Sequence, residues 1–280
     1  MRVKPAPSSS HRFNNQRVKT TVKRCPAKQL RAAGHLFIVR KMKFSVIIPA
    51  YNEAQYIELA IKALQKQIVP RKDFEIIVVD NNSEDNTAEI AKKAGADKVV
   101  KETKQGTNMA RQRGADESKG EIIAFLDADS EPPPDWLEKI KKNLDRSGVA
   151  AVSGPYDYGF KGIKKLANKI YTNLLMPLTP KILHLIFRKK AGVMLGGNFA
   201  IRRPALLKIG GLPPLEFFGD EAAIAMLVSR NAGEVFFDPR LIIKSSPRRF
   251  QKYGLLSTVS KYVYHYLKIY FSHAFDRIKE

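Results

Sequence analysis

Residues 74–79 read Phe-Glu-Ile-Ile-Val-Val, an apolar run in which polar residues do not alternate with apolar ones. Runs of this kind are typical of strands that are covered on both faces, as in a parallel sheet. A β-branched run at 44–48 precedes it, and apolar residues recur at helical spacing through 53–68. The same alternation continues to residue 153. It predicts an α/β fold with a doubly wound, mostly parallel sheet flanked by helices.

The bounds of the expected elements follow from capping and turn residues. We expect strands at 44–48, 74–79, 98–100, 122–126, 149–153, 196–202 and 234–238. We expect helices at 53–68, 83–95, 107–118, 135–146, 220–230 and 255–271, the last of them strongly amphipathic. Pro49 should end the first strand, because proline has no N–H to donate to a central ladder.

The net charge of +22 is unevenly distributed along the chain. More than half of the excess lies in residues 1–43, which contain twelve Lys or Arg and no Asp or Glu. Because this segment has little apolar surface to bury, we expect residues 1–42 to be a disordered basic extension. It could be a basic arm for RNA, a targeting peptide or, as Met42 favours, sequence upstream of the true start. We expect the main domain at 43–240 and a basic, amphipathic helical extension at 241–280.

The composition excludes stabilisation by disulfides or cysteine-bound zinc, and it excludes a membrane-spanning helix. Cys25 is the single cysteine, so neither an internal disulfide framework nor a cysteine-based zinc site can form. The most apolar stretch, up to 182–187, is interrupted by proline and charged residues, so no run reaches the ~18 apolar residues that a membrane-spanning helix needs. We therefore expect a cytoplasmic protein, either free or at the inner face of the cell membrane.

Acidic loops follow three of the expected strands. In an open parallel sheet, ligands bind beyond the carboxyl ends of the strands. The first strand is followed by 49–53, the second by 80–85 and the fourth by Asp127-Ala128-Asp129. Residues i and i+2 of an extended segment share a face, so Asp127 and Asp129 could converge on one Mg²⁺ or Mn²⁺ ion. The alternative is a solvated turn with helix-capping aspartates before the prolines at 132–134.

Two further clusters are candidates for the same edge. Arg111, with Arg113 and Lys104 nearby, could bind a diphosphate, or these residues could form an exposed basic helix face. The acids Asp220 and Glu221 open a helix, where the helix dipole favours negative charge in any case. Alternatively, one of them could act as a general base toward a hydroxyl group.

Six ordered motifs resemble the inverting family 2 glycosyltransferases, which have a GT-A type fold. They are SVIIPAYNE (45–53), EIIVVDNNSEDNT (75–87), GTNMARQRG (106–114), IIAFLDADSEPPPDWL (122–137), GGNFAIRR (196–203) and GDEAAIAMLVSRNAG (219–233). Their order over roughly two hundred residues makes the resemblance far more specific than any single motif. It implies that 43–240 is a GT-A domain.

The resemblance also implies roles for individual residues. The nucleotide-sugar site would consist of Pro49, Ala50, Tyr51, Glu53, Asp80, Arg111, Asp127, Ala128, Gly197 and Asn198. Asp127 and Asp129 match the metal-binding DXD motif, with Mg²⁺ or Mn²⁺ as cofactor. Glu221 aligns with the catalytic base, although the order Asp220-Glu221 reverses the more usual Glu-Asp. Asn81 stands where a second aspartate is frequent.

The implied reaction is a single inverting displacement from a nucleotide-diphosphosugar to an acceptor hydroxyl. The Gln-x-x-Arg-Trp signature of processive members is missing from 246–252, so a single addition is expected. In that segment Arg248 and Arg249 could contact diphosphate or an anionic acceptor, or simply be exposed. A nucleotidyltransferase would typically show a glycine-rich loop after the first strand, which this chain lacks.

The acceptor is expected to be lipid-linked or a saccharide. Basic, apolar segments at 163–187 and 255–271 could lie on an anionic membrane surface, pack on the sheet or form a dimer interface. A catalytically impaired sugar-nucleotide-binding member is an alternative, because the acidic pair is reversed. A basic RNA-binding protein would depend on residues 1–43 and would leave the acidic loops unexplained, so no specific nucleic acid is expected.

Overall fold

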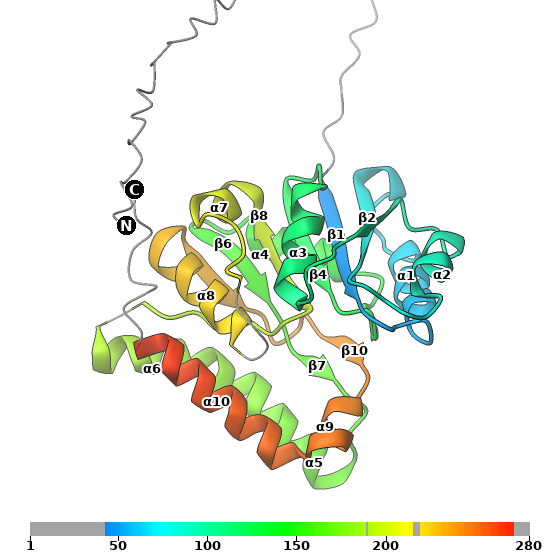
Figure 1. Cartoon of the computed structure of the whole chain (residues 1–280). Helices are drawn as coiled ribbons and strands as arrows, with labels where there is room; N and C mark the ends of the chain where they lie inside the picture. The colour runs from blue at the N-terminus through cyan, green and yellow to red at the C-terminus, as the bar shows by residue number, and fades with distance from the viewer. Residues whose placement is uncertain (1–42, 189, 215–218, 272–280) are drawn as a thin grey trace, which may run out of the picture. The chain divides into compact units, whose positions relative to one another are not determined.

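A computed structural model describes residues 43–188, 190–214 and 219–271 of the chain (Figure 1). The basic extension expected at 1–42 lies outside the described residues, as does the part of the C-terminal extension beyond 271. The remaining elements follow the order that the sequence predicts, with additional short strands and helices.

The central sheet has seven strands in the order β3-β2-β1-β4-β8-β6-β9. These are β1 (Phe44–Ala50), β2 (Phe74–Asp80), β3 (Lys98–Lys101), β4 (Ile122–Leu126), β6 (Val149–Ser153), β8 (Asn198–Arg202) and β9 (Glu234–Phe237). Its strand pairs are parallel except for those of β8, which runs antiparallel to β4 and β6. The expected mostly parallel sheet is confirmed. Because β8 is reversed, its first residue lies at the same edge as the last residues of β1 and β4.

Pro49 does not end the first strand, so that expectation is wrong. β1 continues through Pro49 to Ala50, and its register with β2 pairs Ala50 with Asp80. The pairing of β1 with β4 ends at Ile47, two residues before Pro49. The missing N–H of Pro49 is tolerated because this residue lies beyond the last β1–β4 pair. The extra length carries Ala50 and Asp80 to a common edge.

Helices cover both faces of the sheet. The main ones are η1 (Arg71–Asp73), α1 (Ile57–Gln65), α2 (Thr87–Lys93), α3 (Thr107–Asp116), α4 (Trp136–Leu144), α7 (Arg203–Lys208) and α8 (Asp220–Asn231). On one face α1, α2 and α4 share a buried core with Val46 and Ile48 of β1. On the other face α3, α7 and α8 share a core with Ile47. Successive residues of a strand point to opposite faces, which explains why the strands are apolar throughout.

A second, three-stranded sheet was not anticipated, because its strands are too short to leave a periodic signal. It has the order β5-β10-β7, formed by β5 (Ser130–Glu131), β7 (Tyr156–Asp157) and β10 (Ile243–Ser245). β5 directly follows Asp129, and β10 brings Leu241 and Ile243 into the main core, where both are fully buried. These two residues belong to the segment that was expected to be an extension.

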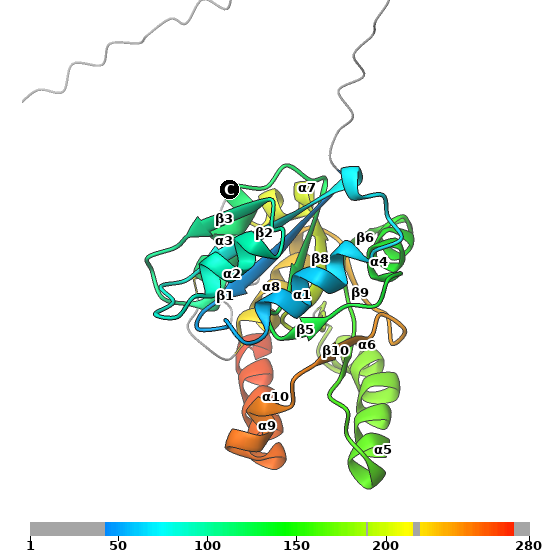
Figure 2. The ribbon, with the colours of Figure 1, turned by 90° about the vertical axis from the view of Figure 1, so that its right-hand side faces the viewer.

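The remaining helices project beyond the edge of the sheet where β1 and β4 end (Figures 1 and 2). They are α5 (Gly162–Ile170), the π-helical turn η2 (Tyr171–Leu175), α6 (Met176–Phe187), α9 (Arg248–Tyr253) and α10 (Leu255–Phe271). α10 packs on α8, where Tyr270 and Ile269 are buried against Ala223 and Met226. Within the described ranges, the helices fall short of the length and hydropathy needed to cross a membrane.

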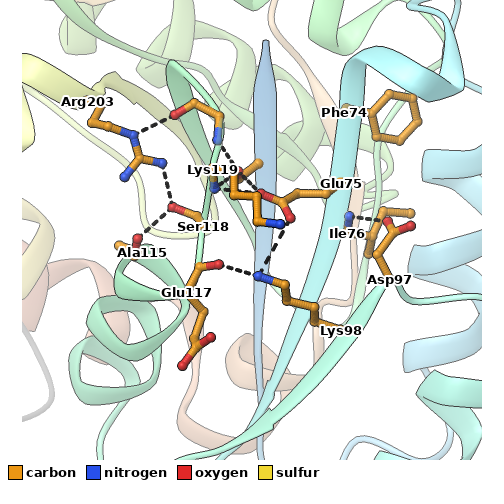
Figure 3. A network of polar contacts seen from close by, with 12 residues as sticks. Phe74, Glu75, Ile76, Asp97, Lys98, Ala115, Glu117, Ser118, Lys119 and Arg203 are labelled. Carbon is orange, nitrogen blue, oxygen red and sulfur yellow. Dashed lines mark hydrogen bonds and ion pairs between the residues drawn. The ribbon is translucent and has the colours of Figure 1, made fainter. Parts of the chain in front are cut away.

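A polar network ties together the opposite edge of the sheet, where the parallel strands begin (Figure 3). The buried Glu75 accepts hydrogen bonds from the Ser45 hydroxyl at 2.6 Å and the Lys119 amide at 2.7 Å. The ammonium group of Lys98 lies 4.0 Å from its second oxygen. Arg203 donates to the Ser118 hydroxyl at 2.8 Å. Glu75, the polar residue inside the run at 74–79, therefore stabilises the fold far from the acidic loops.

Candidate active site

Asp127 lies at the end of β4, where neighbouring elements hold its carboxylate on both oxygens. Arg111 donates to Oδ1 at 3.3 Å, and the hydroxyl of Tyr156 donates to Oδ2 at 3.1 Å. Gly197 packs against the same carboxylate with φ +71°, and a Cβ at this position would lie 2.0 Å from Asp127 Cγ. Only glycine leaves room for this arrangement, because the left-handed backbone and the contact both exclude larger residues.

Asp129 lies deeper than Asp127 and is affected by its charge. Burial, and then the negative charge of Asp127, raise the pKa of Asp129 to about 6. Two carboxylates that repel each other in this way suit a divalent cation, which removes the repulsion. The buried Oε2 of Glu53 has no hydrogen-bond partner among the described residues. Glu53 also raises the pKa of Asp129, so an unused acceptor adds to the negative charge around it.

The donor set therefore fits Mg²⁺ or Mn²⁺ as a two-carboxylate site. Among the residues that the structure describes, there is no group of three or more His, Cys, Asp or Glu that could enclose a metal. Mg²⁺ is usually bound by one or two carboxylates, with water and substrate phosphates completing its shell. Asp127 and Asp129 match that composition, and their binding of a metal stays a prediction.

Arg111 joins the two acidic clusters. Its guanidinium is buried on α3, 3.3 Å from Asp127 and 3.3 Å from Asp220, with Glu221 at 3.8 Å. Burial alone would lower the pKa of Arg111, but the charges of Asp220, Asp127 and Glu221 raise it above its ordinary value. The exposed-face alternative is thus wrong for Arg111, although it describes Arg113, which pairs with Glu117 at the surface.

Asp220 and Glu221 begin α8 and differ in their surroundings. Asp220 is buried and bound by Arg111, whereas Glu221 packs against Gly196, where a Cβ would lie 1.8 Å from its Oε1. Burial, and then the charge and hydrogen bond of Asp220, raise the pKa of Glu221 well above its ordinary value. A carboxylate with a raised pKa is a stronger base, which suits Glu221 to accept a proton.

The loops after β1 and β2 are joined by hydrogen bonds into one rim. The Asn52 amide donates to the Ser83 hydroxyl at 3.1 Å, and the Glu84 amide donates to Asn52 Oδ1 at 2.8 Å. Asp80 accepts from the Ser83 amide at 3.1 Å. This rim carries four residues of the predicted nucleotide site, namely Ala50, Tyr51, Glu53 and Asp80; Tyr51 is exposed, while Ala50 and Asp80 are buried.

Two polar residues near the predicted donor site, Asn81 and Asn198, have hydrogen-bond partners within the protein. Asn81 donates to the carbonyls of Glu102 and Lys104 and accepts from the Gly106 amide, so it holds the loop before α3. The fully buried Asn198 accepts from Trp136 at 2.9 Å. Its amide also donates to the carbonyls of Pro155 and Leu241. Donor binding by Asn198 and Ala128, both buried, stays a prediction.

Arg248 of α9 closes the site from the side of the projecting helices. It forms ion pairs with Asp129 at 2.9 Å and with Glu53, and it lies 5.0 Å from the centre of the Tyr56 ring. The sequence left its role open. Tyr156 was missed, because one tyrosine after a β-strand carries no motif or periodic signal. The site therefore combines residues of β7, α3, α8 and α9 with residues of the loops that follow β1 and β4.

The comparison with protein families gives one family for this region. Glycosyl transferase family 2 matches residues 45–210. This range contains five of the six motifs and ends before the acidic pair at the start of α8.

Among characterised proteins, the chain is similar to glycosyltransferases of archaea. It is 35% identical to glycosyltransferase AglE of Haloferax volcanii over 139 residues, or 47% of this chain and 46% of that one. It is 33% identical to a dolichol-phosphate mannosyltransferase of Pyrococcus furiosus over 124 residues, or 43% of this chain and 35% of that one. The matched part thus spans half or less of the length of these relatives.

Solved structures share the fold. The mannosyltransferase PcManGT of Pyrobaculum calidifontis, in complex with GDP-Man and Mn²⁺, superimposes with a TM-score of 0.66 at 25% identity. The match covers 84% of this chain and 66% of that one. Glucosyl-3-phosphoglycerate synthase of Mycobacterium tuberculosis superimposes with a TM-score of 0.55 at 23% identity, covering 80% of each chain. The expected GT-A architecture is confirmed.

Proposed function

Since the chain belongs to glycosyl transferase family 2, we propose that it is an enzyme that transfers a sugar from a nucleotide-diphosphosugar to an acceptor hydroxyl. One observation carries the proposal: Arg111 forms ion pairs with both Asp127 and Glu221. It thereby joins the candidate metal ligands, Asp127 and Asp129, to the candidate base. The two chemical tasks of the reaction, release of a diphosphate and activation of a hydroxyl, need carboxylates at such neighbouring positions. The PcManGT complex with GDP-Man and Mn²⁺ supports this use of the fold.

The donor would bind across the rim formed by the loops after β1 and β2. Its base and ribose would lie against Pro49, Ala50, Tyr51 and Asp80. Oε2 of Glu53, which has no hydrogen-bond partner in the described part of the chain, offers an acceptor for a hydroxyl group. Its diphosphate would extend toward Asp127 and Asp129. These carboxylates would hold Mg²⁺ or Mn²⁺, which, when bound, offsets the charge that develops on the leaving diphosphate.

Glu221 would take the proton from the acceptor hydroxyl. The hydroxyl oxygen then attacks the anomeric carbon from the face opposite the diphosphate, which inverts the configuration in one displacement. Asp220 is less suited to this role because Arg111 already binds it. Arg111 would act as a positioning residue, since its buried guanidinium pairs with the carboxylates of both clusters. Its contact with the donor, which the resemblance implies, stays a prediction. Holding donor and acceptor in line supplies a large share of the rate.

We further propose that the addition is non-processive and that the acceptor is lipid-linked or a saccharide. The dolichol-phosphate mannosyltransferase relative supports a lipid-linked acceptor, although only 43% of this chain matches it. Peripheral association with a membrane would bring such an acceptor to the site. The reversed order of Asp220 and Glu221 favours one second candidate, a member that binds sugar nucleotides without transferring them.

A thermal-shift screen of nucleoside diphosphates and sugar nucleotides, each with Mg²⁺, Mn²⁺ or EDTA, tests the proposal. We expect one nucleotide to raise the Tm selectively and only with metal, and Asp129→Asn to remove the shift. Donor hydrolysis or transfer with the same nucleotide separates the two candidates, because an impaired member would bind without turnover. No shift with any nucleotide would overturn the proposed function.

A further inference from the structure

The helices that project beyond the site expose an unusual amount of apolar surface. α5 has no buried residue at all. Ile163 at its start is 81% exposed, and Leu185 near the end of α6 is 72% exposed. On α10, Val263, Tyr264 and Phe271 are also exposed. Large exposed apolar patches mark sites of interaction with another molecule or a membrane.

The same helices carry positive charge only. The chain has no Asp or Glu between residues 158 and 215 or between residues 239 and 275. Exposed lysines accompany the apolar residues, namely Lys161 just before α5, Lys164, Lys165 and Lys169 on α5, Lys181 on α6, and Lys261 and Lys268 on α10. We call these exposed residues of α5, η2, α6 and α10 the basic apolar face. Apolar and cationic side chains together are typical of helices that lie in a membrane interface.

The two halves of this face are physically connected. The hydroxyl of Tyr270 on α10 donates to the carbonyl of Leu183 on α6 at 3.1 Å. Phe187 of α6 packs edge-on against Phe271, with ring centroids 5.0 Å apart. Figures 1 and 2 show α5, α6, α9 and α10 on one side of the sheet, beyond the end at which β1 and β4 finish in Figure 1. The face therefore lies on the side of the molecule that carries the candidate active site.

We propose that the basic apolar face docks on an anionic phospholipid bilayer. The charge of this face favours a membrane over a second copy of the chain. A second copy would bring two lysine-rich, acid-free faces together, and these would repel each other. Anionic headgroups instead attract the lysines. The proposal deepens the proposed function, because a docked protein would open its site toward acceptors at headgroup depth. It does not depend on catalysis, since docking needs neither donor nor metal.

An aromatic cavity at the same end of the molecule fits this placement. Its volume is about 810 Å³, and its lining includes Tyr158, Phe160, Ile163 and Phe250, with Lys164 beside them. It lies where the start of α5 meets α9, the helix that carries Arg248. An apolar chain of a bilayer amphiphile could enter here with its anionic group near the lysine.

Co-sedimentation of the full chain with vesicles of phosphatidylcholine, with and without phosphatidylglycerol, tests the docking. We expect binding to the anionic vesicles that Lys164→Glu with Lys165→Glu weakens at least about thirtyfold, since each lysine near such a surface contributes a factor of about five. Leu185→Ser should weaken it as well. The matched controls are Lys92→Glu with Lys93→Glu on α2 and Leu207→Ser on α7, whose side chain is equally exposed. Residues 1–43 are the same in all variants, so differences in vesicle binding between them are due to the substituted helices.

A polarity-sensitive fluorophore can be attached at Leu185→Cys in a chain that also carries Cys25→Ser. Its emission maximum should shift to the blue with anionic vesicles, whereas that of a fluorophore at Leu207→Cys should not. Absence of binding to both kinds of vesicle would overturn the proposal. So would a lipid-free dimer that Leu185→Ser dissociates, because it would assign the face to a second copy. Nucleotide binding in the thermal-shift screen is a separate measurement, so the proposed function can stand or fail without the docking.

Discussion

Gly197 lies directly against the carboxylate of Asp127, so that a side chain on this glycine would occupy the space of the aspartate. Its φ of +71° is in the left-handed region, and the Cβ of an alanine would lie 2.0 Å from Asp127 Cγ. The peptide carbonyl of Gly197 also accepts from the Asp127 amide at 3.3 Å. One short segment before β8 therefore fixes the first of the two candidate metal ligands.

Replacing Gly197 with alanine should displace Asp127 and weaken Mn²⁺ binding at least tenfold. The matched control is Gly210→Ala, because Gly210 has nearly the same φ, +75°, but open space where the Cβ would lie. Both variants should lose about 1 kcal/mol of stability from the left-handed backbone. Calorimetry with Mn²⁺ checks the difference, and equal affinities in the two variants would contradict it.

Glu221→Gln should lower kcat by about a hundredfold or more, as expected for loss of a general base. Donor affinity should stay unchanged, because the substitution preserves shape. Steady-state kinetics and nucleotide titration measure the two effects separately. Glu138→Gln on α4, an exposed glutamate, serves as the control. A Glu221→Gln enzyme with full turnover would remove the base assignment and point to Asp220 instead.

The same substitution should change how stability depends on pH. The pKa of Glu221 in the folded protein is raised above its ordinary value by burial and by Asp220. The folded state therefore holds this proton more tightly, so its contribution to stability is complete at low pH and is lost as pH rises through the folded-state pKa. Glutamine does not titrate, so the Tm of Glu221→Gln should rise relative to the unsubstituted chain from about pH 5 upward. A constant Tm difference would contradict this.

Strand positions and the acidic loops were predictable because each depends on local sequence. Residues 74–79 and 122–126 are apolar on both faces, and Asp127 and Asp129 follow the second run directly. Because the carboxyl ends of parallel strands lie at the same edge of a sheet, the loops that follow them were expected to lie close together. The lengths of some elements were misjudged, as at Pro49, where the neighbouring strand stops first, and the short strands of the second sheet were not anticipated.

Contacts between distant segments were not predictable. The Tyr156–Asp127 and Arg248–Glu53 contacts join residues that no motif relates, through a small sheet of two- and three-residue strands. The burial of Arg111 was equally hidden, since its helix reads as basic and polar. Sequence pattern shows that an arginine is present, but the ion pairs that hold it depend on three segments packing together.

Asp129 should make Mn²⁺ affinity depend on pH near 6. Burial and the charge of Asp127 raise the pKa of Asp129 to about 6. Only the carboxylate form binds metal, so affinity should be level above this pH and fall by up to about tenfold per unit below it. Titration of Mn²⁺ by electron paramagnetic resonance between pH 5 and 8 checks the profile. Asp116→Asn on α3 should keep the profile, and an unchanged profile in Asp129→Asn would exclude Asp129 as a ligand.

Arg248→Ala should strengthen the binding of Mn²⁺ in the absence of nucleotide. The Arg248 guanidinium lies 2.9 Å from Asp129, where it competes with any cation for the same oxygen. Removing it should raise the affinity severalfold, by analogy with other exposed ion pairs. Lys252→Ala, on the same helix but outside the site, should have no effect. Weaker binding in Arg248→Ala would show that the arginine orients Asp129 instead of competing for it.

Arg111→Met should lower the stability of the fold, the affinity of the site for Mn²⁺ and kcat together. Its buried guanidinium neutralises Asp127 and Asp220, and breaking a buried pair typically costs about 3–5 kcal/mol because the partners stay uncompensated. Urea unfolding, with Mn²⁺ titration and kcat, separates this from Arg113→Met, which removes an exposed pair worth less than about 1 kcal/mol. Full Mn²⁺ affinity and kcat in a destabilised Arg111→Met would confine Arg111 to the fold, whereas rescue of all three by Arg111→Lys would place its charge in the site.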